Sequence, residues 1–449
     1  MKKLFSLFVV LLLTTGLFAN GLSLNSIGPK ALGMGGAFVG LADDGSAIYW
    51  NPAGLSWQAK AIHASVADII PMAKYEYETY AIEAEAKKNH YVSPNIFANY
   101  KMGNIGLGFG IYVPAGLGAE WDGEDLLAFN GPAAFDPGGN FPNAFYGIEF
   151  DWMSEIAVID FSPAISYAVN EKFSVGLAAN IYYGMLELKR GADFFGYDLD
   201  PTSAGFGTFA MGAEDGMLDT QQAIDVTGLG FGAALGLMYK PMDNLSIGLS
   251  YRSPVNVEFE GDAAFENAAF AAIPIPGLTE EMAEIDTELD IEWPTWIAGG
   301  LAYEATEKLT ITLDAQYSQW SSLDKIDVIL QFPDALGGET EEEMVLEWED
   351  QTQIRFGAQY ALRPCLDLRG GLYYDPAPSP DETLTILFPS GTYTVVTGGF
   401  GFHKNNFVVD FGAEYLIGGE RDVEASPHNM PGKHNIDIFA FSFGAGYKF

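Results

Sequence analysis

Two short motifs near the N-terminus contain the residue types that bind phosphate or a metal ion. Gly33-Met34-Gly35-Gly36 has the glycine content of a dinucleotide-binding turn, and Asp43-Asp44-Gly45-Ser46 begins like a calcium loop. A dinucleotide turn needs a preceding strand and a βαβ unit, and a calcium loop needs further oxygen ligands downstream. The sequence lacks both contexts, so we expect neither motif to bind a cofactor.

Histidine and cysteine, which carry much metal and nucleophilic chemistry, are scarce. The chain has five histidines and one cysteine, Cys365. A single cysteine excludes an internal disulfide and a cysteine-based metal cluster. No histidine has a Ser, Cys or Asp partner at a spacing that indicates a catalytic site. The sequence therefore predicts no enzyme, no cofactor and no metal site.

The chain is strongly acidic. It has 22 Lys and Arg against 60 Asp and Glu, which gives a formal net charge of −38. Nucleic acids and anionic lipid surfaces are bound by clustered Lys and Arg, so we expect neither nucleic acid nor a basic membrane-binding patch. Divalent cations that bridge acidic loops to lipopolysaccharide fit this composition, but the sequence does not locate a site for them.

Residues 1–19 have the pattern of a secretory signal peptide. Lys2 and Lys3 precede an apolar run at 4–13, and small residues follow at 16–19. An uncleaved anchor helix is the alternative, against which the short apolar run argues. A secreted chain with 52 glycines and 14% aromatic residues is either a soluble β-protein or an outer-membrane barrel.

The hydrophobic alternation favours the barrel. In residues 309–318, LTITLDAQYS, every second residue is apolar or alanine and the others are polar. Similar runs occur at 173–185, 245–252 and 407–415. Period two indicates a strand with one apolar face, and runs of about ten residues match a tilted strand that crosses a bilayer.

We therefore predict an all-β fold, a transmembrane antiparallel β-barrel of about 14 strands. The expected strands are 58–70, 93–102, 104–114, 155–169, 172–190, 226–240, 244–260, 290–304, 308–320, 350–361, 365–375, 392–404, 405–417 and 434–449. Residues 326–332 are either an extra strand or the raised end of a hairpin. Long connections are expected at 115–154, 191–225, 261–289 and 321–350, and short turns between them, which is the outer-membrane pattern.

The last predicted strand alternates aromatic residues and ends at Phe449. A terminal Phe of this kind resembles the signal by which the barrel assembly machinery recognises its substrates. That machinery is therefore an expected partner, together with outer-membrane lipid and lipopolysaccharide.

Residues 28–55, GPKALGMGGAFVGLADDGSAIYWNPAGL, resemble the N-terminal plug of the FadL/TodX family of outer-membrane channels. The similarity is concentrated at 33–38, 42–44 and 51–55, and weaker matches extend over most of the mature chain. The resemblance implies three parts: a signal peptide at 1–19, a hatch at 20–57 and a multi-pass transmembrane barrel at 58–449.

The same resemblance implies passive uptake of hydrophobic small molecules, such as long-chain fatty acids or aromatic hydrocarbons. Extracellular loops capture the ligand, the hatch moves, and the ligand leaves laterally at a kinked third strand. The hatch and gate residues would be Gly33, Gly35, Gly36, Asp43, Asp44, Asn51, Pro52 and Ala53. We expect Asn51-Pro52-Ala53 to be the hinge of the hatch, or otherwise a structural link into the first strand.

In the predicted third strand, Gly106, Gly108 and Gly110 share one face and Pro114 follows. Glycine in a strand marks a bend or a close backbone approach. This pattern fits a kink that opens a lateral gate. The alternative is that the small residues make room for the hatch.

Two long loops supply apolar side chains for ligand capture. A groove is expected from Phe206, Phe209, Phe265, Phe270, Ile273, Leu278 and Met282, unless these side chains only pack the loops together. The expected candidates for a ligand's acid head group are Arg252, Arg355 and Arg369, with cross-lumen ion pairing as the alternative. Where the family often has an acidic–basic motif, this chain reads PSGTY at 389–393, which argues against carboxylate recognition.

Other functions stay open at this point. Some family relatives serve protein secretion, as surface shuttles or cargo docks without solute transport. A structural or adhesive barrel would bind no ligand, and an outer-membrane lipid hydrolase is the remaining enzyme class.

Overall fold

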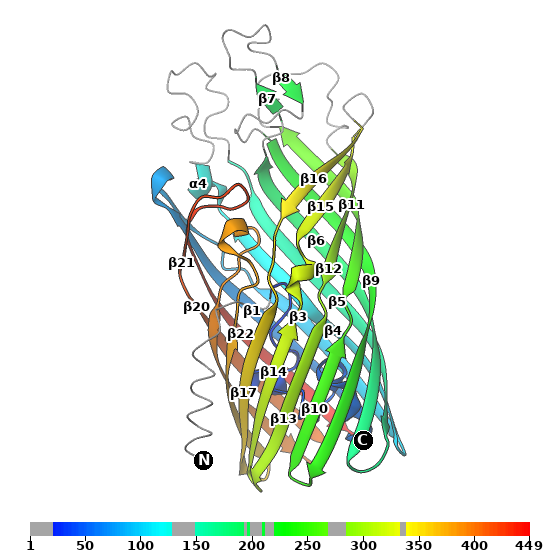
Figure 1. The fold of residues 1–449 in the computed structure, drawn as a ribbon. Coiled ribbons are helices and arrows are strands. Elements are labelled where there is room, and N and C mark those ends of the chain that lie inside the picture. The colour runs from blue at the N-terminus through cyan, green and yellow to red at the C-terminus, as the bar shows by residue number, and fades with distance from the viewer. Residues whose placement is uncertain are drawn as a thin grey trace.

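The computed structural model describes residues 21–127, 149–192, 195–197, 209–211, 220–267, 284–332 and 338–449. The predicted signal peptide lies outside these residues. Strands form a tall closed barrel with tight turns at one end (Figure 1). Among the described residues, no helix is both long enough and apolar enough to cross a membrane.

Fourteen antiparallel strands build the wall, and it closes where β1 pairs with β22. Ten are continuous: β1 (Ala61–Tyr77), β3 (Tyr91–Met102), β4 (Ile105–Trp121), β5 (Trp152–Ala168), β6 (Phe173–Ala192), β9 (Thr220–Met242), β18 (Leu366–Asp375), β19 (Tyr393–Lys404), β20 (Phe407–Gly418) and β22 (Gly432–Lys448). Four are interrupted: β10 (Leu245–Arg252) with β11 (Val255–Asn267), β12 (Glu284–Trp293) with β13 (Trp296–Thr306), β14 (Leu309–Ser318) with β15 (Lys325–Gln331), and β16 (Glu339–Val345) with β17 (Gln351–Arg363). The predicted barrel of about 14 strands is confirmed.

Short elements complete the described chain. The short strands are β2 (Ile82–Glu85), β7 (Phe195–Tyr197), β8 (Phe209–Met211) and β21 (Arg421–Val423). The helices are α2 (Pro29–Gly33), α3 (Ala47–Trp50), η1 (Pro52–Trp57), η2 (Glu78–Tyr80), α4 (Gly123–Leu126), η6 (Trp320–Ser322) and η8 (Asp381–Thr383). Residues 326–332 fall largely in β15, which pairs with β12 and β16 and so forms the raised end of a hairpin.

Several strands run further than expected. β4 continues to Trp121, β9 begins at Thr220 and β11 continues to Asn267, all inside segments that we predicted to be loops. The reason is that the alternation continues there with its faces exchanged. Apolar side chains point inward and acidic ones point outward, so a search for strands with a lipid-facing apolar side misses these ends.

The exchange of faces is clearest at the break between β10 and β11. Ile247 and Leu249 of β10 are 45% and 50% exposed, whereas Val257 and Phe259 of β11 are 0% and 1% exposed. Ser253-Pro254 interrupts the strand between them, and Pro294-Thr295 does the same between β12 and β13. Because side chains alternate with period two, such a break shifts which residues face the lumen.

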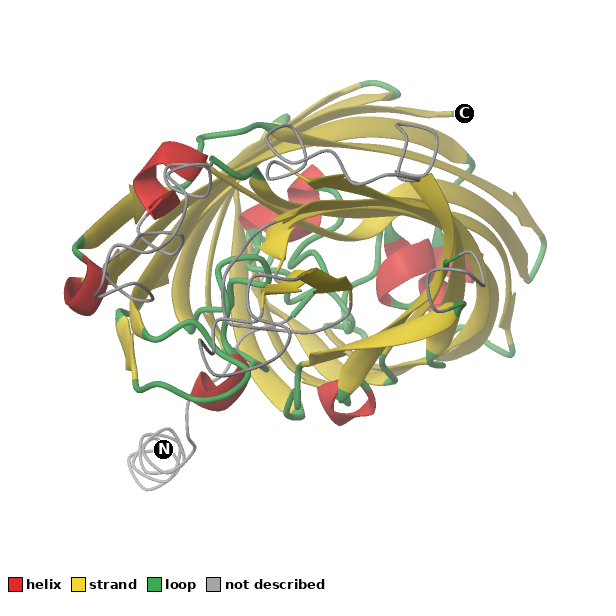
Figure 2. Cartoon of the chain, turned by 90° about the horizontal axis from the view of Figure 1, so that it is seen from above, coloured by secondary structure: helices red, strands yellow, loops and turns green. Residues whose placement is uncertain are grey.

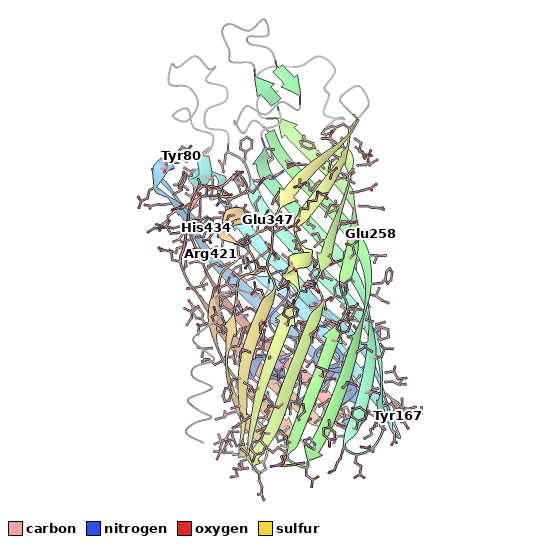
Figure 3. All side chains as sticks on the ribbon, viewed as in Figure 1. Tyr80, Tyr167, Glu258, Glu347, Arg421 and His434 are labelled. Atoms are coloured by element: carbon pink, nitrogen blue, oxygen red, sulfur yellow. The ribbon has the colours of Figure 1, made fainter. Side chains whose placement is uncertain are left out.

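The outer surface of the barrel consequently has two zones. The lower zone exposes apolar residues on most strands, as a surface in contact with lipid does. Above it, the outer face of β11 and β12 is acidic, and Glu258, Glu260 and Asp262 lie opposite Asp290, Glu288 and Asp286. Figure 3 shows Glu258 on the upper outer wall and Tyr167 near the lower end. The bilayer therefore surrounds the lower zone, and the upper zone projects beyond it.

Residues 21–57 lie inside the lower half of the barrel, where the view from above shows helices within the ring of strands (Figure 2). Helix α2 packs against β19 and β20, and η1 packs against β5, β6 and β9 on another part of the wall. Nearly every residue from Ile27 to Ser56 is buried. This segment, called the plug below, fills the lumen at the level of the membrane.

Candidate functional site

Asn51 fixes the plug to the wall. Its side-chain Nδ2 donates to the carbonyl of Val39 at 3.1 Å and to that of Leu237 in β9 at 3.1 Å. Its Oδ1 accepts from the backbone N–H of Ala53 at 3.2 Å, and Pro52 begins η1 directly after it. Asn51 is fully buried. A hinge motion at Asn51 would have to break these bonds.

The plug glycines allow close approach to the wall. Gly35 and Gly36 have φ values of +65° and +63°, which favour glycine. A Cβ at Gly35 would lie 2.9 Å from the carbonyl oxygen of Phe356, and one at Gly36 would clash with the guanidinium of Arg355. Gly33 packs on the backbone of Gly399 in β19. The glycine-rich motif therefore serves dense packing in a filled lumen.

The two plug aspartates stabilise the plug itself. Lys30 donates to both carboxylate oxygens of Asp43 at 2.7 Å. Asp44 accepts from the backbone N–H of Ser46 at 2.9 Å and from its hydroxyl at 2.6 Å, just before α3. Within the described residues, no group of His, Cys, Asp and Glu has the arrangement of a metal site.

β4 separates from β3 beyond the pair Ile96–Ile111. Pairing between the two strands ends at Ile96–Ile111, and the register of β4 against β5 shifts between Tyr112 and Ala115, around Pro114. The end of β3 from Tyr91 remains paired with β1 but not with β4. The wall therefore lacks backbone pairing between these strands beyond Ile96–Ile111, and this interruption, which the ring of Tyr91 crosses to reach Gly118, is called the lateral opening below.

The start of the plug covers part of this opening. Ser23 forms an antiparallel bridge with Ala115, the N–H of Leu24 donates to Pro114 at 2.9 Å, and the N–H of Gly116 donates to Leu22 at 2.9 Å. Residues 22–24 thus occupy the free edge of β4. A free edge is a ready template for such pairing.

The upper end of the lateral opening is closed by a charged contact. Lys87, between β2 and β3, donates from its ammonium to Glu120 of β4 at 2.8 Å, and its backbone N–H donates to the Glu120 carbonyl at 2.7 Å. The side-chain hydrogen bond with Glu120 raises the pKa of Lys87. The opening is therefore bounded by this pair above and by the β3–β4 ladder below.

Gly106 and Gly108 contact the plug. A Cβ at Gly106 would lie 2.6 Å from the carbonyl carbon of Leu55, and one at Gly108 would lie 2.8 Å from its Cδ1. Gly110 instead lies beside the rings of Phe97 and Tyr112. The geometry of the first two glycines supports the alternative that they make room for the plug, and Pro114 marks the strand irregularity.

A cavity of about 250 Å³ connects the lumen with the lateral opening. On the wall side it is lined by 91–93 of β3 and by 116–118 of β4, and on the lumen side by Tyr393, Glu414 and Ile438. Residues 23–26 of the plug form part of its boundary. Most other lining side chains are apolar, and they include Leu32, Ile69, Ile156 and Leu416.

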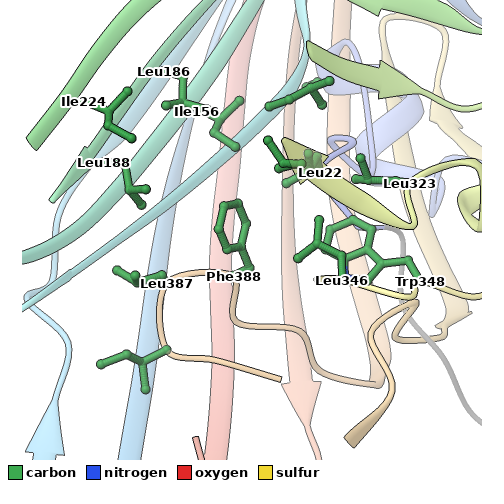
Figure 4. Packing of buried hydrophobic residues seen from close by; sticks show 14 of the residues in the cluster. Leu22, Ile156, Leu186, Leu188, Ile224, Leu323, Leu346, Trp348, Leu387 and Phe388 are labelled. Carbon is green, nitrogen blue, oxygen red and sulfur yellow. The ribbon is translucent and has the colours of Figure 1, made fainter. Parts of the chain in front are cut away.

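Apolar side chains also line the lumen above the plug. Leu186, Leu188 and Ile224 point inward, and the inward loop between β18 and β19 brings Leu387 and Phe388 against the same cluster (Figure 4). The cluster continues across the lumen to a group that includes Leu22, Leu323, Leu346 and Trp348. An apolar interior in the part of the barrel that projects beyond the bilayer is unusual for a water-filled pore, whose lumen is polar.

The three arginines proposed for an acid head group lie in the lumen but not on the cavity. Arg369 forms a buried ion pair with Asp410 at 2.6 Å. Arg252 lies between the rings of Tyr49 and Trp296, with its guanidinium carbon 3.9 Å and 4.3 Å from their centroids. Arg355 stacks on Tyr373, with its guanidinium carbon 4.2 Å from the ring centroid.

Most of the expected capture groove falls outside the described residues. Phe206, Phe270, Ile273, Leu278 and Met282 are not described, and of Phe209 only the backbone in β8 is. Phe265 is described, and its ring lies 5.5 Å from that of Phe332 at the upper end of the lumen. The capture groove therefore stays a prediction.

Several residues of the site had no distinct sequence signal. Leu24 and Asn25 precede the recognisable plug motif, and Asp375 and Glu414 look like ordinary alternating strand residues. Glu414 was recognisable as an inward-facing acid of β20, but its place on a cavity depends on β3 and β4, which are more than 290 positions earlier in the chain.

Comparisons of sequence agree with this architecture. The profile of a family described as "Outer membrane protein transport protein (OMPP1/FadL/TodX)" matches residues 10–449. The 47 kDa outer membrane protein of Pasteurella multocida is 25% identical, over 75% of this chain and 92% of its own length. The long-chain fatty acid transport protein of Escherichia coli K12 is 22% identical, over 98% of this chain and 97% of its own.

Comparisons of structure show the same fold. A crystal structure of a Pseudomonas aeruginosa FadL homologue superposes with a TM-score of 0.73 at 17% identity, and covers 96% of this chain and 100% of its own. The toluene transporter TodX of Pseudomonas putida superposes with a TM-score of 0.72 at 20% identity, and covers 95% and 99%.

Proposed function

The chain belongs to the outer membrane protein transport protein family (OMPP1/FadL/TodX), a family of outer-membrane transporters of hydrophobic compounds, and from this premise we propose that it is a passive channel for hydrophobic small molecules. Long-chain fatty acids and aromatic hydrocarbons are the ligand classes that the names of its relatives suggest. No catalytic step is part of this proposal.

The observation that carries the proposal is the continuous apolar lining from the projecting upper lumen to the lateral opening. A polar saccharide layer obstructs apolar solutes, so a protein that takes them up must offer apolar surface beyond the bilayer. The inward apolar side chains of β11 and β12 make the upper lumen apolar, although they are packed together there, and the cavity of about 250 Å³ provides a site further in. That volume is close to the lower end of small-molecule pockets, about 300 Å³.

Lateral exit is the path that we propose for release. The plug blocks direct passage through the lumen, since its residues are buried against several strands. The lateral opening lies beside Val92, which is 62% exposed on the outer wall. A ligand that moves from the cavity through this opening would enter the apolar part of the membrane and would not have to cross water.

A limited movement of the plug accompanies this release in our proposal. Residues 22–24 occupy the edge of β4 through a few backbone hydrogen bonds, whereas Asn51 and Ala53 are tied to the wall by buried side chains. We propose that the first residues of the plug move and that the part around Asn51 stays. The barrel assembly machinery and lipopolysaccharide are proposed as partners in biogenesis and in the membrane.

Uptake of apolar solutes tests the function. Cells with and without the gene, and liposomes with and without the purified protein, are given radiolabelled alkylbenzenes and fatty acids. We expect protein-dependent uptake of at least one class, and unchanged uptake of a hydrophilic sugar of similar mass. If every apolar solute enters equally fast without the protein, the channel proposal fails, and a role in protein secretion becomes the better candidate.

A further inference from the structure

The polar groups of the cavity indicate which apolar molecules it accepts. We propose that the cavity selects molecules with an apolar body and a hydrogen-bond-donating head, an alcohol or a protonated amine, and discriminates against carboxylate anions. This inference rests on the proposed transport function, because it concerns the ligand of the same site.

The charged side chains on the cavity are acidic. Asp375 and Glu414 are 1% and 6% exposed, and Glu155 lies at the outer side of the opening. His90 is the basic side chain at the opening, and neither Lys nor Arg is among the described residues that line the cavity. Like charges repel more strongly where water is excluded, so a carboxylate placed here would be destabilised.

Glu414 has capacity to accept a further hydrogen bond. The hydroxyl of Tyr373 donates to its Oε2 at 2.9 Å, and this is the hydrogen bond that reaches Glu414 from the described residues. A carboxylate offers about four acceptor positions on its two oxygens and no donor. Asp375 accepts from the side-chain amide of Gln353. Glu414 therefore leaves acceptor positions for a ligand head that donates, whereas the serine hydroxyls that line the cavity, those of Ser26, Ser93 and Ser390, offer a carboxylate neutral donors and no positive charge.

The nearby arginines do not supply a positive charge at the cavity. Arg355 donates to Gln353 Oε1 at 2.6 Å and to the carbonyl of Gly35 at 3.1 Å. Arg355 and Arg252 line a separate cavity of about 20 Å³, which holds no more than a water molecule. Leu24 and Asn25 border both cavities and so stand between the arginines and the larger one.

The third arginine, Arg369, is paired with Asp410 and is therefore not available to a ligand in the larger cavity. Its Nη1 lies 2.6 Å from the Asp410 carboxylate, and its Nε donates to Gln359 at 2.9 Å. Neither residue lines the larger cavity. A fatty-acid carboxylate would therefore meet acids at the cavity and would find each arginine already bonded elsewhere or separated from it.

A matched series of ten-carbon ligands tests the inference. Decylamine, decanol, decanoate and decane displace the fluorophore N-phenylnaphthylamine from the full chain in lipid nanodiscs. The measurements are made at about pH 8, where ordinary carboxylic acids are ionised and alkylamines are protonated. We expect decylamine and decanol to bind at least about tenfold more tightly than decanoate, after correction for partition into empty nanodiscs.

Two variants and a control locate the effect. Glu414→Gln and Asp375→Asn are each expected to reduce the preference for decylamine over decanoate by about tenfold. Glu288→Gln removes an acid from the outer face of β12 and is expected to leave this ratio unchanged.

The outcomes separate the inference from the transport proposal. Decanoate binding as tight as that of decylamine, or a ratio that both cavity variants leave unchanged, overturns the inference and leaves the transport proposal standing. If none of the four ligands displaces the fluorophore from the unaltered chain, both are overturned.

Discussion

Ser23 and Ala115 form an antiparallel bridge that joins the beginning of the plug to the free edge of β4. The bridge lies beside the cavity, whose lining includes Ser23 and Gly116. It is therefore the contact that has to change if a ligand leaves through the wall at this height.

A disulfide at this bridge should stop transport. Paired residues on antiparallel strands have Cα atoms about 4.5–5.5 Å apart, within the range of about 4.4–6.8 Å that a disulfide spans. We expect Ser23→Cys/Ala115→Cys to lose uptake of apolar solutes when oxidised and to regain it with dithiothreitol. The background carries Cys365→Ser, because Cys365 is the one native cysteine. Equal uptake by the oxidised and reduced forms, with the bond verified by mass spectrometry, would contradict the proposed movement.

Crowding β4 against the plug should displace the plug. Val at Gly106 would place its Cβ 2.6 Å from the carbonyl carbon of Leu55, and such overpacking costs about 1–3 kcal/mol. We expect Gly106→Val to lower the temperature at which the barrel loses its compact form on SDS gels and to raise the passage of a polar antibiotic. Gly299→Val in β13 is the control, because nothing lies within 4 Å of its Cβ position. A tight, stable Gly106→Val barrel would show that the plug is not held at this contact.

Loss of one partner of the buried ion pair should be more harmful than loss of both. Arg369 and Asp410 have side chains only 3% and 11% exposed. Removing one partner leaves the other charge buried without compensation, which costs about 3–5 kcal/mol. We expect Arg369→Gln and Asp410→Asn each to lower the urea midpoint of unfolding in detergent, and the double variant to recover part of the loss. Strictly additive losses would mean that the two side chains are not coupled.

Asn51→Asp should loosen the plug without a change of shape. The substitution removes the two amide donors that reach Val39 and Leu237 at 3.1 Å. Buried carbonyls left without donors cost about 1–3 kcal/mol each. We expect faster amide exchange in residues 36–57, with little change in the wall strands. Asn244→Asp in the exposed turn between β9 and β10 is the comparison variant, and the same exchange rates in both would mean that Asn51 does not anchor the plug.

Much of the wall was predictable from local pattern. The alternation in 309–318 or 407–415 has the same meaning in any barrel, because a strand between lipid and lumen must be apolar on one side. The prediction of loops failed at 220–225 and 261–267, which are strand; within them, Asp225 and Asp262 face outward, whereas Ile224 and Ala263 face inward. A rule that places apolar side chains toward lipid does not hold beyond the bilayer, and the Ser253-Pro254 and Pro294-Thr295 breaks are the local signs of the change.

Less of the candidate site than of the wall could be predicted from the sequence. The motif at 33–55 indicated a plug, and the close packing of Gly35 and Gly36 agrees with their glycine requirement. Arg252, Arg355 and Arg369 were recognisable as inward-facing cations, but their partners Tyr49, Tyr373 and Asp410 belong to other segments of the chain. No local pattern indicates that these contacts occupy the arginines while acids line the cavity.

The sequence by itself determined the class of the protein: period-two strands of membrane length, an apolar outer belt and a glycine-rich N-terminal segment are local properties of the chain. Only the tertiary structure decided where β3 parts from β4, that residues 22–24 cover the gap, and that Glu414 and Asp375 face the cavity behind it. The physical reason is that ring closure of the barrel brings together side chains hundreds of residues apart, and the charge balance of a lumen depends on those distant neighbours.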